Sequence, residues 1–211
     1  MEQKPINTIY TILLNEYPDA KSGLNYNTAF ELLIAVMLSA QCTDKRVNKV
    51  TIELFNKAKT PEELLALGEK ELEDVIKPCG LYKSKSRNIA DTCRILIDKF
   101  KGNVPDEFEE LIKLPGVGRK TANVVLIEAF DIPAIPVDTH VFRVSNRIGL
   151  AHAKNPEQAE NQLSKTIPKG IWIKMHHLLI THGRKTCMAK KPKCDFCKIN
   201  KYCDFTKQII K

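Results

Sequence analysis

Apolar residues recur three or four positions apart through most of this chain, which is the spacing that gives a helix one hydrophobic face. The pattern is clear in residues 6–13, 89–100 and 122–130. No segment alternates between apolar and polar residues over a length that would make a half-buried strand. The pattern therefore predicts an all-α fold in which these apolar faces form the core.

Capping residues followed by proline mark two helix starts. Thr60-Pro61-Glu62-Glu63 and Asn155-Pro156-Glu157 each place a capping side chain before a proline at the first helical position, with acids in the first turn. Two other stretches, 17–23 and 131–136, are rich in turn residues and in residues that stop helices. We expect a central helical domain between these two stretches.

The composition suits a globular protein, since 43% of the 211 residues are hydrophobic. The longest apolar stretch, Leu32–Leu38, is too short to span a bilayer, and the start of the chain lacks the basic-then-apolar order of a signal peptide. We therefore expect an intracellular protein that does not enter a membrane. The net charge of +8 suits a polyanionic partner, although a merely soluble basic protein has the same composition.

Four of the seven cysteines lie close together in the order Cys187-x6-Cys194-x2-Cys197-x5-Cys203. Thiolates spaced in this way can converge on one metal centre. The spacing alone fits zinc and a four-iron cluster equally well, and disulfides are disfavoured in a reducing compartment. The three scattered cysteines, Cys42, Cys79 and Cys93, are expected to be buried thiols.

The segment Leu111–Ala122 predicts a hairpin between two helices. Pro115 suits a chain leaving one helix, while Gly116 and Gly118 permit positive φ and leave backbone N–H groups uncovered at the start of the next helix. A phosphate should bind those amides. The segment fits neither the P-loop nor the dinucleotide fingerprint. A tight turn in which the glycines serve only geometry remains the alternative.

Lys120 stands in the first turn of that second helix. It could be one more phosphate contact, the commoner task for lysine. Our hypothesis goes further: the positive end of the helix dipole disfavours the ammonium form, so the amine could attack a sugar carbon and form a Schiff base. Asp138 could steady a cationic sugar or accept a proton, but the residue pattern favours an ordinary helix N-cap.

Three motifs follow one another along the chain: the hairpin LPGVGRKTA (114–122), the segment VDTHV (137–141) and the cysteine-rich tail. In this order and at these separations they resemble the endonuclease III family of helix-hairpin-helix DNA glycosylases. The likeness covers essentially the whole chain, including residues 32–44 and 80–89. It implies a two-lobed all-α fold: a six-helix barrel domain over 22–132, and a cluster domain built from 1–21 and 133–211.

The resemblance also implies roles for individual residues. Lys120 matches the family's nucleophile and Asp138 its catalytic carboxylate, which would face each other across the cleft between the lobes. The four clustered cysteines match the ligands of a 4Fe-4S cluster, and Gln41 and Leu81 match residues that fill the gap left by an extruded nucleotide. We also assign DNA contacts to five further residues: Leu114, Gly116, Gly118, Arg119 and Lys191.

The implied activity is removal of oxidised pyrimidines from duplex DNA, followed by strand cleavage on the 3′ side of the abasic site. The implied partner is double-stranded DNA with damaged bases or abasic sites, bound by a monomer in the cytoplasm at the nucleoid.

Mismatch glycosylases resemble the chain less. Adenine enzymes of that type carry glutamate where this chain has Ala35, and they lack a lysine at the position of Lys120. A non-catalytic DNA-binding module with a zinc knuckle and a lyase restricted to abasic sites are two competing interpretations. Each of the five histidines is expected to be structural.

Overall fold

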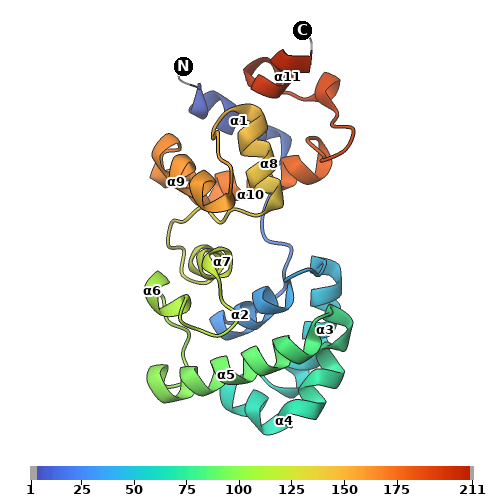
Figure 1. Ribbon diagram of the computed structural model, residues 1–211, viewed down its shortest axis with the longest axis vertical. Helices are drawn as coiled ribbons and strands as arrows, with labels where there is room; N and C mark the ends of the chain where they lie inside the picture. The colour runs from blue at the N-terminus through green and yellow to red at the C-terminus, as the bar shows by residue number, and fades with distance from the viewer. Residues whose placement is uncertain (1–3, 210–211) are drawn as a thin grey trace. The chain divides into compact units, whose positions relative to one another are not determined.

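The computed structural model describes residues 4–209, which form helices with no β-strand among them (Figure 1). This confirms the predicted all-α fold. The α-helices are α1 Ile6–Glu16, α2 Ala29–Leu38, α3 Asp44–Lys57, α4 Pro61–Ile76, α5 Tyr82–Phe100, α6 Phe108–Leu111, α7 Arg119–Ala129, α8 Thr139–Ile148, α9 Pro156–Thr166, α10 Trp172–Lys185 and α11 Asp204–Ile209. Short 3-10 helices are η1 Lys77–Cys79, η2 Lys169–Ile171, η3 Cys194–Phe196 and η4 Asn200–Tyr202.

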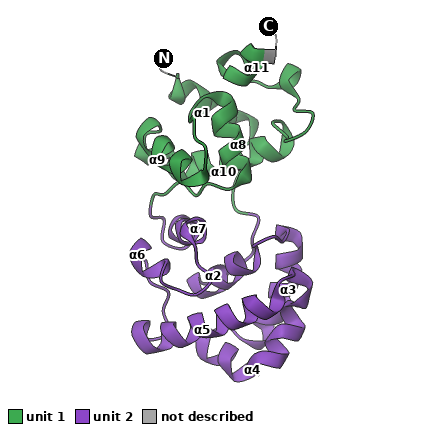
Figure 2. Ribbon diagram, viewed as in Figure 1, with its two compact units in different colours: residues 1–22, 133–211 green, residues 23–132 purple. Residues whose placement is uncertain are grey.

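The chain divides into two compact units (Figure 2). Unit 1 comprises Met1–Ser22 and Pro133–Lys211, and unit 2 is the continuous segment Gly23–Ile132. The points of division fall within or beside the two stretches, 17–23 and 131–136, that lack a helical pattern. Each unit has its own hydrophobic core, formed by the apolar faces of its helices.

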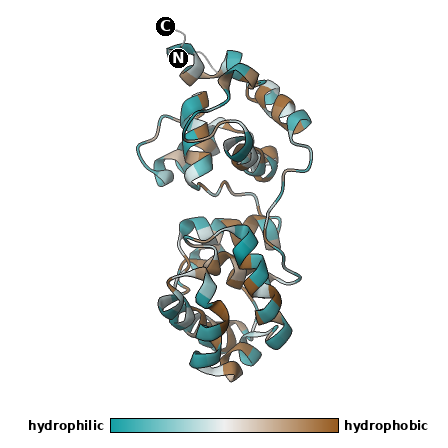
Figure 3. Cartoon of the chain, turned by 90° about the vertical axis from the view of Figure 1, so that its right-hand side faces the viewer, coloured by the Kyte–Doolittle hydropathy of each residue, from teal (hydrophilic) through white to brown (hydrophobic). Residues whose placement is uncertain are grey.

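Helix α2 lies at the centre of unit 2. Every residue from Phe30 to Leu38 is buried, and a helix that is apolar on all sides must be covered on all sides. Helices α3, α5 and α7 supply that cover, and α4 packs along α5. Buried residues recur at helical spacing in α3, α4 and α5, which are therefore amphipathic. Hydrophobic residues (brown) and hydrophilic residues (teal) accordingly share single helices in Figure 3. The arrangement fixes α7, which carries Lys120, against the centre of the unit.

Unit 1 is built around the pair α8 and α10, with α1 packed on α10 and α9 on α8 (Figure 1). Its core includes Ile9 and Leu13 from α1 together with Val141 and Val144 from α8. The Nζ atom of Lys174 donates to the carbonyl oxygens of Pro18 and Ala20, each at 2.9 Å, and so holds the stretch after α1 against α10. Segments from both ends of the sequence therefore form one unit.

The predicted capping residues start their helices as expected. Thr60 Oγ1 accepts a hydrogen bond from the Glu63 N–H at 3.2 Å, and Asn155 Oδ1 accepts one from the Gln158 N–H at 2.9 Å. Each cap satisfies an N–H group that the helix itself cannot pair, which stabilises a helix by about 1 kcal/mol. Among residues 4–209, no helix has both the length and the apolar character needed to cross a membrane.

Candidate functional site

The predicted hairpin joins α6 to α7 in unit 2. The Leu114 N–H donates to the Leu111 carbonyl at 3.1 Å, and the Val117 N–H donates to the Leu114 carbonyl at 3.0 Å. The side chains of Leu114 and Val117 are buried in the core of the unit. These two buried side chains fix the turn. Gly116, which lies between them, and Gly118, which follows Val117, are exposed. Because the Leu114 side chain is buried, only its backbone is available to a ligand.

The two hairpin glycines have different conformations. Gly116 has φ +77°, a left-handed conformation that side chains disfavour, as predicted. Gly118 has φ −92° and ψ 175°, so it does not use the positive φ that glycine permits. Gly118 is instead the N-cap of α7 and has no side chain to cover the amides of the first helical turn. Such an open helix start is a favourable place for a phosphate.

The difference between the glycines makes a matched pair of substitutions informative. A Cβ atom at Gly116 would lie 2.9 Å from Asn88 Nδ2, whereas a Cβ at Gly118 would meet nothing within 4 Å. We expect Gly116→Ala to lower the free energy of unfolding by about 1–3 kcal/mol and Gly118→Ala to lower it by less than about 1 kcal/mol. Urea unfolding measures both, and equal losses would contradict this account of the turn.

Lys120 is the second residue of α7, and its side chain is exposed. It therefore lies in the first turn, where the positive end of the helix dipole disfavours an ammonium group, as the hypothesis requires. The neighbouring Arg119 places its guanidinium carbon 4.9 Å from the ring centroid of Phe108 in α6. This cation–π contact links the first residues of both helices and orients the start of α7.

Gln41 and Leu81 occupy two exposed loops of unit 2, and both have unusual backbone conformations. Their φ angles are +54° and +49°, in the left-handed region that residues other than glycine rarely adopt. Leu81 is also 58% exposed, although leucine normally belongs in the core. Backbone strain of this kind concentrates at functional sites.

Three further residues other than glycine have positive φ among those described. Lys191, another candidate DNA contact, is exposed with φ +51°. Lys101 is the C-cap of α5 and Asp131 follows the C-cap of α7, where a left-handed residue is an ordinary way to end a helix. The strained positions without such an ordinary explanation therefore coincide with candidate DNA contacts.

Asp138 belongs to unit 1 and is half-buried as the N-cap of α8. Its Oδ1 atom accepts a hydrogen bond from the Val141 N–H at 2.7 Å, which confirms the predicted cap. The bond fixes the rotamer of the carboxylate. A cap does not exclude a chemical role, because a carboxylate oxygen can accept more than one hydrogen bond.

The four C-terminal cysteines are free thiols in the segment after α10. Cys187 comes two residues after that helix, Cys194 begins η3, and Cys197 and Cys203 directly follow η3 and η4. Burial raises the pKa of the Cys194 thiol and raises that of Cys197 to about 11, and the charges of other cysteines in this group add to both shifts. The other three cysteines all contribute to the raised pKa of Cys197, so the four thiols belong to one region of unit 1. No three His, Cys, Asp or Glu side chains among the described residues are grouped as a site for one metal ion.

Two arginines of α8 hold the cysteine-rich segment. Arg147 donates to the Met188 carbonyl at 2.7 Å and approaches Cys187 Sγ at 3.5 Å, while its own carbonyl lies 3.2 Å from Cys203 Sγ. Arg143 donates to the carbonyls of Gly183 and Cys187 at 2.9 Å and 3.0 Å. Neither arginine was predicted from the sequence, where their spacing of four residues on one helix is the only signal.

His182 contacts the same region from α10. Its Nε2 atom lies 3.7 Å from Cys197 Sγ, and its Nδ1 atom lies 3.1 Å from the Tyr17 hydroxyl. Burial lowers the pKa of this histidine to about 4, so it is neutral at physiological pH. The expectation of a structural histidine agrees with this position in the core of unit 1.

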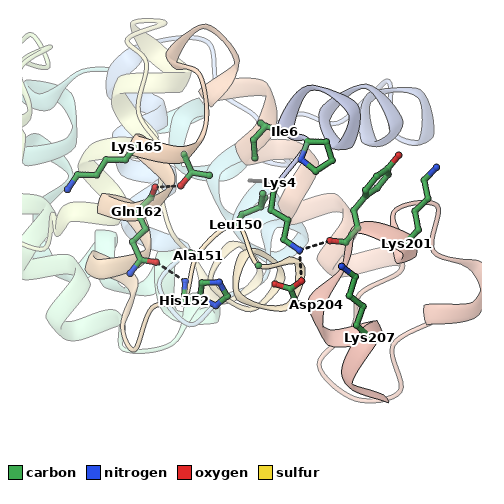
Figure 4. A pocket seen from close by; sticks show the side chains of 14 residues that line it. Lys4, Ile6, Leu150, Ala151, His152, Gln162, Lys165, Lys201, Asp204 and Lys207 are labelled. Atoms are coloured by element: carbon green, nitrogen blue, oxygen red, sulfur yellow. Dashed lines mark hydrogen bonds and ion pairs between the residues drawn. The ribbon is translucent and has the colours of Figure 1, made fainter. Parts of the chain in front are cut away.

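A depression of about 980 Å³ also lies in unit 1 (Figure 4). Lysines line it, and Lys4 forms an ion pair with Asp204 and donates to the Tyr202 carbonyl at 2.9 Å. None of the predicted catalytic residues or cysteine ligands lines this depression. The size of this depression therefore does not mark it as the site of the predicted chemistry.

Comparisons with known proteins give one consistent result. Residues 34–169 match the family model described as HhH-GPD superfamily base excision DNA repair protein. The chain is 50% identical over 205 residues to Endonuclease III of Rickettsia conorii, covering 97% of this chain and 98% of that protein. It is 49% identical over 201 residues to Endonuclease III of Escherichia coli K12, covering 95% of each.

Solved structures agree with these relatives. The fold matches "Structure of a Trapped Endonuclease III-DNA Covalent Intermediate: Estranged-Adenine Complex" with a TM-score of 0.92 at 47% identity, over 98% of this chain and 97% of the other. It also matches "Structure of a non-covalent Endonuclease III-DNA Complex" with a TM-score of 0.91 at 48% identity, covering 97% and 96%. Identity and coverage at this level establish the family. The chain belongs to the endonuclease III family of HhH-GPD base excision DNA repair proteins.

Proposed function

We propose that this protein is a bifunctional DNA glycosylase and abasic-site lyase that removes oxidised pyrimidines from duplex DNA. The observation that carries the proposal is Lys120, an exposed amine in the first turn of a helix that follows a glycine hairpin. Support comes from the solved relative that is described as a covalent intermediate with DNA, since a covalent intermediate requires a nucleophile. Unit 2 then corresponds to the six-helix barrel domain and unit 1 to the cluster domain.

The first step is extrusion of the damaged nucleotide. A base stacked inside a duplex is out of reach, and extruding it costs a few kcal/mol, less where damage weakens stacking or pairing. Leu81 presents an exposed apolar side chain and Gln41 an exposed polar one. In this proposal both enter the duplex and occupy the space that the nucleotide leaves.

The next steps take place at the sugar. The Lys120 amine attacks C1′ and displaces the base, while Asp138 stabilises positive charge on the sugar and assists proton transfer. The resulting Schiff base makes the C2′ proton acidic. Loss of that proton drives β-elimination, which breaks the bond to the phosphate on the 3′ side. One lysine thereby supports both activities.

Phosphate binding holds the DNA during these steps. The amides at the start of α7 suit an anion, and Arg119 beside them carries a permanent positive charge. Lys191 offers a further cation from the cysteine-rich segment. The surplus of positive charge in the whole chain supports binding to duplex DNA. We infer a monomer that acts in the cytoplasm at the nucleoid.

We further propose that the four C-terminal cysteines hold a 4Fe-4S cluster. The donor set fits, because four free thiols lie within one short segment of unit 1, and thiolates are the usual ligands of such clusters. When bound, the cluster would order this segment. Arg143 and Arg147 already fix its backbone, and the exposed Lys191 extends from it towards solvent.

Metal analysis tests the cluster directly. We expect brown protein with iron and acid-labile sulfide in equal amounts, about four of each per chain. Cys194→Ser should lower both contents, whereas Cys93→Ser should leave them unchanged, because Cys93 is a buried thiol in the core of unit 2. If the protein is colourless and contains one zinc ion per chain, the four cysteines hold zinc and not a 4Fe-4S cluster.

Borohydride trapping tests the proposed function. We expect a covalent adduct between the protein and a duplex that contains one abasic site, and release of oxidised pyrimidines from duplexes that contain them. Trapping without base release would restrict the enzyme to lyase activity. Binding without trapping or release would indicate a non-catalytic DNA-binding module.

A further inference from the structure

Lys85 is a buried lysine whose partners are backbone carbonyls. It lies in the first turn of α5 and is only 6% exposed. Its Nζ atom donates to the carbonyls of Leu38 and Ala40, each at 2.8 Å, and to that of Cys79 at 3.0 Å. An ammonium group has three N–H donors, so these three bonds satisfy it completely.

The three carbonyls come from two separate segments. Leu38 ends α2 and Ala40 lies in the loop that follows, whereas Cys79 ends η1. Lys85 therefore ties the loop after α2 to the turn before α5. Its charge also lies at the C-terminal end of α2, where the unpaired carbonyls and the helix dipole favour a cation.

A second contact joins the same two segments. The thiol of Cys79 lies close to that of Cys42, and burial together with this neighbour raises the pKa of Cys79 to about 11. A thiol with so high a pKa is unreactive at physiological pH. This pair therefore adds packing rather than chemistry.

The tied segments carry the two strained residues. Gln41 directly follows Ala40, and Leu81 follows Cys79 with one residue between them. Both strained residues project from the surface, and both have positive φ. Strained conformations persist only where the surroundings over-determine them, and the Lys85 bonds supply such a constraint at the adjacent carbonyls.

Burying a cation costs free energy, and at Lys85 three hydrogen bonds to carbonyls offset that cost in place of a carboxylate partner. We propose that Lys85 is a positioning residue that locks the Gln41 and Leu81 loops together, so that both side chains enter the duplex as one preformed wedge. This inference rests on the proposed function, since it concerns how the damaged nucleotide is extruded. Preforming the wedge avoids the entropy loss of ordering two loops when DNA binds.

The test compares double-stranded and single-stranded substrates. Lys85→Met keeps the unbranched side chain, which is one atom shorter, but removes the three hydrogen bonds. We expect base release from a damaged duplex under single-turnover conditions to fall about 10- to 100-fold. Trapping on a single-stranded oligonucleotide with an abasic site should stay at the parent rate, because no duplex has to be opened. Lys99→Met, which removes an exposed charge from the same helix, should change neither rate.

A double-mutant cycle makes the test specific. Gln41→Ala combined with Leu81→Ala removes the wedge itself, and adding Lys85→Met to that variant should cause no further loss on duplex DNA. If the losses multiply instead, Lys85 does not act through these two side chains and the proposal is overturned. Equal losses on duplex and single-stranded substrates would also overturn it.

Two controls separate the possible failures. If Lys85→Met does not fold, Lys85→Arg serves in its place. It keeps the charge, but its planar group cannot direct donors at three converging carbonyls, so the same selective loss on duplex DNA is expected. Failure of the parent protein to trap or to release bases would count against the proposed function. An active parent with unchanged Lys85 variants would count against this inference alone.

Discussion

Lys120→Gln is expected to abolish the borohydride-trapped adduct with abasic DNA and to slow base release by about 10³-fold or more. The amide nitrogen of glutamine has no available lone pair, so it cannot attack C1′ or form a Schiff base. Glutamine nevertheless keeps the size and polarity of the side chain and suits a helix. DNA binding should therefore fall far less than the chemical step, as a gel-shift titration beside the trapping assay would show.

Lys113→Gln is the matched control for Lys120→Gln. Lys113 lies in the same hairpin, is exposed and forms an ion pair with Glu110 at 2.6 Å. Its loss removes the same charge from nearly the same place, yet the adduct should still form at the parent rate. If Lys120→Gln forms as much adduct as the parent protein, the nucleophile is another amine and not Lys120.

Asp138→Asn is expected to slow base release by about 10²- to 10⁴-fold while the protein stays folded. Asparagine caps a helix about as well as aspartate, so the bond from the Val141 N–H survives. It carries no charge to stabilise a cationic sugar and cannot accept a proton. The free energy of unfolding should change by at most about 1 kcal/mol, while single-turnover base release reports the loss of chemistry.

Asn155, another N-cap in unit 1, is expected to show the opposite result, in which stability falls and base release is unchanged. Asn155→Ala removes the hydrogen bond from the Gln158 N–H and should lower the free energy of unfolding by about 1 kcal/mol without affecting base release. The two variants together separate capping from catalysis. If Asp138→Asn releases bases at the parent rate, Asp138 is a cap and nothing more.

Local features of this fold could be predicted from the sequence because their causes are local. Thr60, Asn155 and Asp138 each cap a helix through a hydrogen bond to an N–H three residues further on. The apolar faces of α1, α5 and α7 likewise follow from residue spacing within one helix. Such short-range physics is visible in a linear sequence.

Other features depend on segments that only the tertiary fold brings together. Lysine is normally exposed, so no sequence pattern indicates that Lys85 is buried among carbonyls of two distant segments. Leucine normally avoids positive φ, so the conformation of Leu81 was equally hidden. The two hairpin glycines look alike in sequence, yet only Gly116 contacts Asn88 closely enough to exclude a side chain.

Unit 1 is formed by two separate stretches of the chain, and this affects the order in which the parts of the protein fold during synthesis. On the ribosome, α1 emerges first but lacks α10, its packing partner, until nearly the whole chain has been synthesised. The continuous segment Gly23–Ile132 can collapse earlier, because all of its core residues are then available. The hairpin that carries Lys120 should thus fold before the cysteine-rich segment has been synthesised, and loading of the proposed cluster would follow the folding of unit 2.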